Sequence, residues 1–300
     1  MTRPLRFGLV GTGHWARITH APALAATDGI EFAAVWGRNA DAAAGLAASY
    51  QATAHHDLSA FLADVDAVAF AVPPDVQAPI AIRAASAGKH LLLEKPIAIA
   101  TADADALAGA VEQAGVASVV FFTARFQADV RAWVAEVTAA GGWAGGCAVW
   151  LGSALQPESP FNTPWRREKG ALWDLAPHVV SLLWASLGPV RSVTAQAGLA
   201  DITHLILRHE NGATSTATVT LSAPLSDDFT ELYVWGQAGR SAAPAQTPDP
   251  VTPLRTALTE LAANARAGQA SHPCDARFGR DIAHVLAAAQ HEIDVQRPLP

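Results

Sequence analysis

A glycine-rich turn near the start of the chain constrains the fold more than any other feature. An apolar run short enough for one buried strand ends in Gly11-x-Gly13-x-x-Ala16, and a segment that could form a helix follows at once. In this context a dinucleotide pyrophosphate binds at a helix N-terminus. The alternative is a purely structural glycine turn. The residues expected to contact the cofactor here are Gly11, Thr12, Gly13, His14, Trp15 and Ala16.

Short apolar runs alternate with helical segments through residue 122. This alternation predicts a doubly wound parallel sheet with helices on both faces, the Rossmann arrangement of an α/β protein. Asp57 is expected to cap a short helix that starts at Leu58, and Gly88 to end a later one. After the first strand, the expected strands are 31–36, 67–72, 90–93 and 116–122, and the longer helices are 39–49, 76–87 and 101–113.

The remainder, 123–300, has a different pattern and predicts an α+β substrate-binding domain with an antiparallel sheet. Asn211-Gly212 lies between two β-prone arms, which is the strongest short-range signal for a hairpin. We expect a domain boundary after residue 122, although the last helix could pack back on the first domain. The expected elements are helices 129–139, 170–187 and 278–293, a strand 146–152, and loops 156–164 and 241–253.

Composition excludes several classes of protein. Of the 300 residues 51% are hydrophobic and 16% charged, which indicates a globular chain, and a net charge of −7 without a basic cluster argues against nucleic-acid binding. Cys147 and Cys274 are far apart, and the pair His55-His56 has no third ligand spaced to join it, so no metal site is expected. No signal peptide and no membrane-length apolar run is recognised, so a cytoplasmic protein is expected.

The segment after the second strand bears on the choice of cofactor. It reads Gly37-Arg38-Asn39, with no acid until Asp41, whereas an NAD site places a carboxylate near this point. The guanidinium of Arg38 suits a 2′-phosphate, and Asn39 adds hydrogen-bonding capacity, so the sequence favours NADP over NAD. The alternative is a solvated loop arginine. Further cofactor contacts are expected at the ends of the next strands, from Val72, Pro73, Pro74, Glu94 and Lys95.

Lys95 is the first candidate catalytic residue. It follows three leucines and Glu94 and precedes Pro96, so it lies where a parallel strand ends at the ligand-binding edge of an open sheet. An ammonium group there could bind a substrate oxygen and stabilise the charge that develops during hydride transfer. Taken alone, a lysine at a strand end is more often a surface residue.

Asp174 and His178 are the second candidates. They are four residues apart, so on one helix they would share a face, with the histidine exchanging a proton and the carboxylate holding it or a sugar hydroxyl. Alternatively, Asp174 favours a helix dipole and His178 is a packed side chain. Nearby aromatic and basic residues could contact substrate or could be packing: Trp165, Arg166 and Trp173.

Together these segments resemble the Gfo/Idh/MocA oxidoreductases, the relatives of glucose-fructose oxidoreductase and inositol dehydrogenase. The resemblance is carried by the glycine turn, by Gly88-Lys89-His90 running to Glu94-Lys95-Pro96, and by the Asp174/His178 segment. It implies nicotinamide-dependent hydride transfer at a carbinol carbon, usually of a sugar, cyclitol or related polyol. The position of Lys95 contacts the reacting oxygen in such enzymes, and those of Asp174 and His178 bind substrate and exchange its proton.

The resemblance also implies a large open sheet in the second domain, frequently used to pair subunits, so a homodimer or tetramer is expected. The chain departs from the family at Gln77, Ala176 and Ser181, where histidine, glycine and aspartate are common. Two other functions stay open. One is a ligand sensor that keeps the dinucleotide site without turnover, and the other is a reductase of an imine or aromatic carbonyl.

Overall fold

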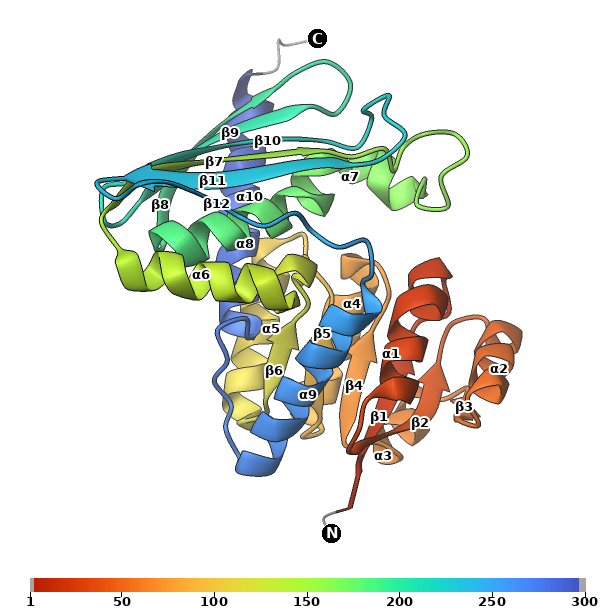
Figure 1. Cartoon of the computed structure of the whole chain (residues 1–300). Helices are drawn as coiled ribbons and strands as arrows, with labels where there is room; N and C mark the ends of the chain where they lie inside the picture. Colours follow the sequence, from red (N-terminus) through yellow and green to blue (C-terminus); the bar gives the residue numbers. More distant parts are fainter. Residues whose placement is uncertain (1–2, 297–300) are drawn as a thin grey trace. The chain divides into compact units, whose positions relative to one another are not determined.

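The computed structural model describes residues 3–296, which form two compact units (Figure 1). Of these residues, the first unit contains 3–126 together with Pro248–Arg280, and the second contains Gln127–Thr247 together with 281–296. Sequence analysis expected a single boundary after residue 122. In the structure, Pro248–Arg280 also belongs to the first unit, and the chain passes into the second unit after Arg280, within the last long helix.

The first unit is built on a parallel sheet of six strands in the order β3-β2-β1-β4-β5-β6, which confirms the Rossmann prediction. The order reverses beside β1, so β1 and β4 are neighbours although two strands separate them in sequence. The central strands are apolar and fully buried because helices cover both faces. The strands are β1 (Leu5–Val10), β2 (Ile30–Trp36), β3 (Thr53–His55), β4 (Ala67–Phe70), β5 (His90–Leu93) and β6 (Ser118–Val120).

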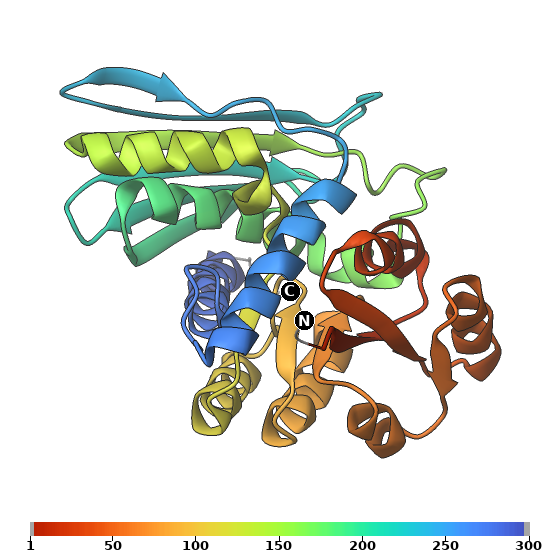
Figure 2. The same ribbon diagram turned by 60° about the horizontal axis from the view of Figure 1, so that its bottom comes forward.

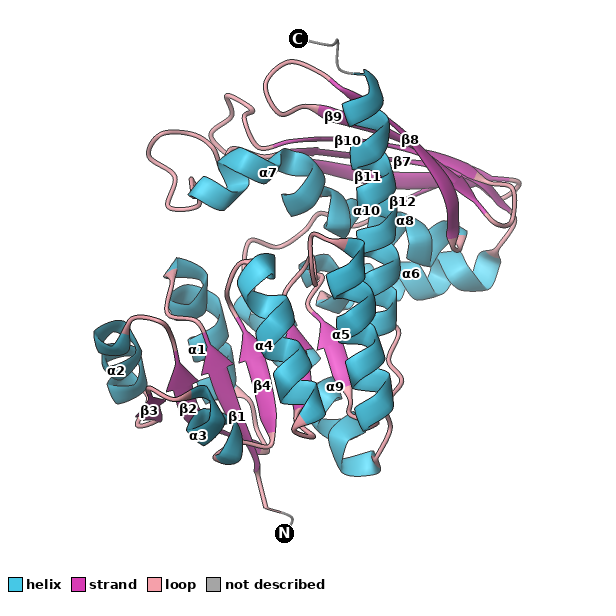
Figure 3. Cartoon of the chain, turned by 180° about the vertical axis from the view of Figure 1, so that it is seen from behind, coloured by secondary structure: helices cyan, strands magenta, loops and turns pink. Residues whose placement is uncertain are grey.

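Helices α1 and α9 lie on one face of this sheet and α4 and α5 on the other (Figures 1 and 3). Asp57 caps α3 by accepting the N–H of Ala60 at 2.8 Å, and Gly88 follows α4 with a φ of +73°, as predicted. The helices are α1 (Ala21–Ala26), α2 (Ala40–Ser49), α3 (Leu58–Ala63), α4 (Pro74–Ser86), α5 (Thr101–Ala114) and α9 (Val251–Ala267), with short η1 (Ala16–His20) and η2 (Thr123–Phe126).

The prediction of a loop over 241–253 is wrong at its end, where helix α9 begins. Prolines and alanines suggested an irregular segment, but the helix already begins at Val251, and Pro253 lies in its first turn. A proline is tolerated there because the first N–H groups of a helix have no intrahelical acceptor.

The second unit contains a six-stranded sheet in the order β12-β11-β7-β10-β9-β8. Its pairs are antiparallel except β7 with β10, and Asn211-Gly212 joins β9 to β10 as predicted. Helices α6 and α8 lie side by side on one face (Figure 2). The elements are α6 (Ala128–Ala140), β7 (Trp143–Leu151), α7 (Pro164–Asp174), α8 (Ala176–Leu187), β8 (Val190–Ala197), β9 (Thr203–His209), β10 (Thr214–Thr220), β11 (Phe229–Gly236), β12 (Gly239–Ala242) and most of α10 (Ala276–Gln296).

The prediction of one continuous helix over 170–187 is wrong. Helix α7 starts earlier, at Pro164, and is kinked at Gly170, whose φ of 65° and ψ of −168° are not helical. It ends at Asp174, and α8 begins at Ala176. Pro177, which has no N–H to donate, occupies the first turn of α8. Asp174 and His178 therefore lie on two successive helices, and not on one face of a single helix.

Within residues 3–296, no helix is both long enough and apolar enough to cross a bilayer.

Candidate functional site

The glycine turn has the geometry that its sequence predicts. Gly11 has a φ of +125°, and a Cβ added to it would lie 2.4 Å from the carbonyl oxygen of Ala71, so only glycine fits. Gly13 is exposed, and a Cβ added there meets no atom of the described residues within 4 Å. Ala16 is fully buried. The space beside Gly13 is thus open to a ligand.

A helical segment begins at His14, directly after the turn, and includes the π-helical stretch η1 before α1. The first N–H groups of a helix have no acceptor within the helix, so the start of this helix beside Gly13 suits an anion such as a pyrophosphate. Single π turns are frequent at functional sites. Here the π turn carries His20, which is fully buried.

The other predicted cofactor residues follow neighbouring parallel strands. Gly37-Arg38-Asn39 follows β2, Val72-Pro73-Pro74 lies between β4 and the start of α4, and Glu94-Lys95 follows β5. Because β2, β1, β4 and β5 are adjacent, all these segments lie at the carboxyl edge of one sheet.

Arg38 is exposed, and within the described chain it has no hydrogen-bond or ion-pair partner. Asn39, in contrast, already uses its side-chain oxygen to cap α2 by accepting the N–H of Ala42 at 2.9 Å. Gly37 packs against Thr12: a Cβ added to Gly37 would lie 2.9 Å from Cγ2 of Thr12. The guanidinium of Arg38 is therefore available to a ligand, whereas the side-chain oxygen of Asn39 is already in use.

A buried glutamine holds the turn that carries Lys95. The side-chain oxygen of Gln77 accepts the N–H of Glu94 at 2.8 Å. Its amide nitrogen donates to the carbonyl oxygens of Glu94 at 2.8 Å and Ile97 at 3.2 Å. Lys95 itself is half-buried, and the peptide bond to Pro96 is cis.

The carboxylate of Glu94 is held from the glycine-turn helix. Its Oε1 accepts the indole N–H of Trp15 at 2.6 Å and lies 2.9 Å from Nε2 of His20, which is fully buried. Its Oε2 accepts the backbone N–H of Lys95 at 3.2 Å. Trp15 and Glu94, both predicted to contact cofactor, thus also bind each other. Sequence analysis missed His20, which no motif marks.

In the second unit, Asp174 forms an ion pair with Arg166. The Nε–H of Arg166 donates to Asp174 Oδ2 at 2.6 Å, and the guanidinium lies over the rings of Phe161 and Trp165 at 5.3 and 6.0 Å. Asp174 is only 5% exposed. A buried carboxylate requires charged or hydrogen-bonding partners, and Arg166 is one of them.

His178 is buried in the first turn of α8, with its ring 5.3 Å from that of Trp150. Trp173 is 3% exposed, and its indole N–H donates to Gln290 of α10 at 3.2 Å. Trp173 is therefore part of the core of the second unit, whereas Trp165 and Arg166 are partly exposed.

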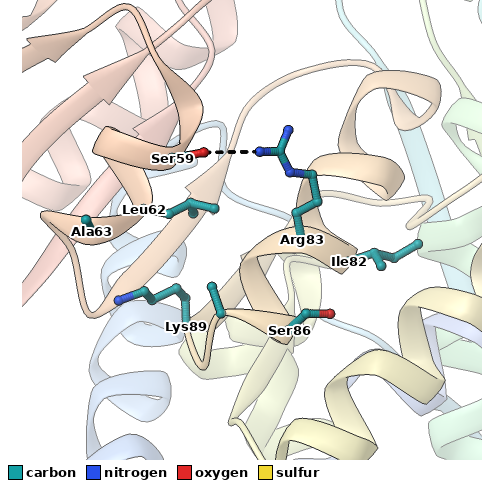
Figure 4. A pocket seen from close by; sticks show the side chains of 8 residues that line it. Ser59, Leu62, Ala63, Ile82, Arg83, Ser86 and Lys89 are labelled. Atoms are coloured by element: carbon teal, nitrogen blue, oxygen red, sulfur yellow. Dashed lines mark hydrogen bonds between the residues drawn. The ribbon is translucent and has the colours of Figure 1, made fainter.

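A pocket of about 580 Å³ lies between α3 and α4 of the first unit, and Figure 4 shows the side chains that line it. Arg83 donates to Ser59 Oγ there at 3.5 Å, and Lys89 donates to the carbonyl oxygen of Val65 at 2.9 Å. The carboxyl ends of both helices face this cavity, and their dipoles disfavour an anion. No predicted site residue lines it. Across residues 3–296, no group of three or more His, Cys, Asp or Glu side chains could hold a metal ion.

The strand order of the parallel sheet and the glycine turn after β1 define the first unit as a dinucleotide-binding Rossmann domain. Comparison with known families extends this conclusion to most of the chain. Residues 5–122 match the Gfo/Idh/MocA model described as an oxidoreductase family with an NAD-binding Rossmann fold, and residues 146–241 match the C-terminal domain of the same family. The chain therefore belongs to the Gfo/Idh/MocA family.

Curated relatives match over part of their length. UDP-N-acetylglucosamine 3-dehydrogenase of Acidithiobacillus ferrooxidans is 38% identical over 109 residues, which cover 36% of this chain and 34% of that protein. Levoglucosan dehydrogenase of Pseudarthrobacter phenanthrenivorans is 33% identical over 142 residues, covering 44% and 35%. The matches thus span about a third of each relative.

Solved structures match over nearly the whole chain. GenD2 from gentamicin A biosynthesis, in complex with NAD, has a TM-score of 0.85 at 22% identity and covers 99% of this chain and 96% of its own. Levoglucosan dehydrogenase, in complex with NADH and levoglucosan, has a TM-score of 0.84 at 20% identity and covers 98% of both chains. At this identity the likeness shows the fold.

Proposed function

We propose that this protein is a nicotinamide-dependent oxidoreductase that interconverts a carbinol and a carbonyl carbon. The observation that carries the proposal is the carboxyl edge of the first sheet, where an open glycine turn and the Lys95 turn lie on neighbouring strands. A nicotinamide dinucleotide, when bound, accepts or donates the hydride. The open space at Gly13 and the helix start at His14 fit its pyrophosphate.

The side chains of the protein would bind and polarise the substrate and move its proton. Lys95, at the end of β5, would hydrogen-bond the reacting oxygen and stabilise negative charge on it. His178 would relay the proton, since imidazole exchanges protons near neutral pH. Asp174, with its carboxylate fixed by Arg166, would orient a hydroxyl of the substrate.

NADP is the preferred cofactor in this proposal. The exposed guanidinium of Arg38, which has no protein partner in the described chain, follows β2 where a 2′-phosphate would lie, and no acid stands at that point. GenD2 and levoglucosan dehydrogenase were solved with NAD and NADH, so the proposed NADP preference rests on Arg38 of this chain alone. It is tested by comparing the Kd values of NADPH and NADH.

A sugar, cyclitol or similar small polar compound is the proposed substrate. Relatives are named for UDP-N-acetylglucosamine and levoglucosan, both sugars. Trp165 and Trp150 add aromatic surface around the Asp174 and His178 segment, to which the apolar face of a sugar ring could bind.

A substrate panel tests this function. Sugars, polyols, cyclitols, aromatic carbonyls and imines would be incubated with the protein, and NAD(P)H absorbance followed. Turnover of a sugar or polyol supports the proposal. Turnover confined to imines or aromatic carbonyls would favour the other reductase, and no turnover despite tight NADPH binding would favour a sensor.

We also propose that the protein forms a homodimer or tetramer through the second sheet. Ile206, Phe229 and Trp235 are 49%, 48% and 42% exposed, and strand register places them on one face. Leu183 and Leu187 of α8 contact the opposite face, beside Gly146. Light scattering after size-exclusion chromatography tests the proposal, which a monomer at micromolar concentration would contradict.

A further inference from the structure

Gln77 lies in the first turn of α4 and is fully buried, yet its side chain contacts the main chain on both sides of Lys95. It binds Glu94 through both N–H and C=O, each at 2.8 Å, and reaches the carbonyl oxygen of Ile97 at 3.2 Å. A longer contact of 3.4 Å joins it to the carbonyl oxygen of Pro96. One amide therefore satisfies main-chain groups before and after the lysine.

These contacts begin where the strand ladder ends. Strand β5 stops at Leu93, so the polar groups of the next residues have no neighbouring strand to bind. Buried groups of this kind require a partner. A primary amide accepts and donates at once, which neither a carboxylate nor an apolar side chain does. Gln77 thus fixes two points of the main chain that flank Lys95.

We propose that Gln77 is a positioning residue for the reaction: its side-chain amide holds the Lys95 turn so that the ammonium group meets the reacting oxygen. This inference rests on the role proposed for Lys95 above. Gln77 does not need to touch substrate or cofactor, because it acts through the backbone. Small displacements of a catalytic group lower rates steeply, by about 100-fold for 1 Å.

Gln77→Met keeps the length of the side chain and removes its hydrogen bonds. We expect kcat to fall about tenfold or more, while the Kd of NADPH changes less than about threefold, because the glycine turn is untouched. Gln127 offers a matched control: it is buried and binds both the N–H and the C=O of Thr247, at 3.3 and 3.2 Å. Gln127→Met should lose stability without loss of kcat.

A double-mutant cycle with Lys95→Ala separates positioning from general stability. If Gln77 acts through Lys95, then Gln77→Met should lower kcat in the wild-type background and cause no further loss in the Lys95→Ala background. The inference would be overturned if Gln77→Met lowered kcat by the same factor in both backgrounds, or if it did not lower kcat in the wild-type background. If the methionine variant does not fold, Gln77→Asn replaces it, since the shorter neutral amide cannot keep all the contacts with Glu94 and Ile97.

Hydrogen exchange provides a readout that does not depend on turnover. In Gln77→Met the peptide containing Glu94 and Lys95 should exchange about tenfold faster, while the peptide of β4 is unchanged. Unchanged exchange at Glu94 overturns the inference even in an active enzyme. If the wild type reduces or oxidises no substrate of the panel, the proposed function fails, and the exchange measurement still decides whether Gln77 fixes the turn.

Discussion

The carboxylate of Asp174 binds the guanidinium of Arg166 at 2.6 Å, and Arg166 is the partly exposed member of the pair, at 23% against 6% for the side chain of Asp174. Removing the arginine would take this charge-assisted hydrogen bond from a buried carboxylate. We expect Arg166→Met to lower the free energy of unfolding by roughly 2 kcal/mol, less than for a fully buried pair. Urea denaturation of the variant and the wild type measures this difference in the free energy of unfolding.

The neighbouring Arg167 is exposed and serves as the control. Arg167→Met should leave the free energy of unfolding within about 0.5 kcal/mol of wild type. Equal stabilities of the two variants would show that Asp174 does not depend on Arg166.

The two glycines of the turn should respond differently to alanine. Gly11→Ala places a Cβ 2.4 Å from a backbone oxygen at a φ of +125°, so it should destabilise the fold by roughly 2 kcal/mol. Gly13→Ala meets no protein atom within 4 Å and should leave stability unchanged. Because its methyl group occupies space proposed for the pyrophosphate, it should weaken NADPH binding about tenfold or more. Calorimetric titration and denaturation measure the two effects, and unaltered NADPH affinity in Gly13→Ala would contradict the assignment.

Cofactor selectivity should depend on Arg38. Arg38→Ala removes a cation that suits the 2′-phosphate, so the Kd of NADPH should rise about tenfold or more while that of NADH stays within about twofold. Arg83 of α4, which donates to Ser59 of α3, is the control arginine: Arg83→Ala should change neither Kd. An unchanged ratio of the two Kd values in Arg38→Ala would contradict the NADP preference.

Acid should destabilise the fold partly through His90. Burial lowers the pKa of His90 below its ordinary value of 6.5, with the nearby charge of Asp66 opposing the shift, and its Nδ1 accepts the N–H of Ala117 at 3.0 Å. The folded state therefore binds fewer protons than the unfolded state. The stabilising contribution is complete above about pH 6.5 and is lost as the pH falls towards the folded pKa.

Denaturation at pH 7.5 and 5.5 tests this expectation. His90→Asn should reduce the loss of stability between the two values, whereas His291→Asn, at an exposed position, should leave that loss unchanged. If His90→Asn shows the same pH dependence as wild type, His90 is not one of the groups responsible.

Local signals predicted much of the fold. The Asp57 cap, the Gly88 helix end and the Asn211-Gly212 hairpin each depend on residues adjacent in sequence, where backbone preferences act directly. The start of helix α9 escaped prediction because Pro253 and the two prolines just before the helix resemble those of a loop. The break at Gly170 escaped because a single positive φ leaves no periodic signature.

The contacts that organise the candidate site were less predictable. Lys95 and Glu94 were recognised from their place after an apolar strand, but the partners of this turn come from distant segments. Gln77 is 17 residues away and His20 is 74 residues away from Glu94. Such pairs depend on tertiary packing, and one sequence without its fold does not specify them.

The most direct test of the proposed function is the effect of Lys95→Met on turnover and on cofactor affinity, measured on the same preparation. Lys95 is proposed to stabilise charge on the substrate oxygen, and its expected contact with the cofactor is proposed to contribute much less to affinity than the glycine turn does. The account predicts that kcat falls about 100-fold or more while the Kd of NADPH changes less than about threefold. An unchanged kcat, or equal losses of turnover and NADPH affinity, would contradict it.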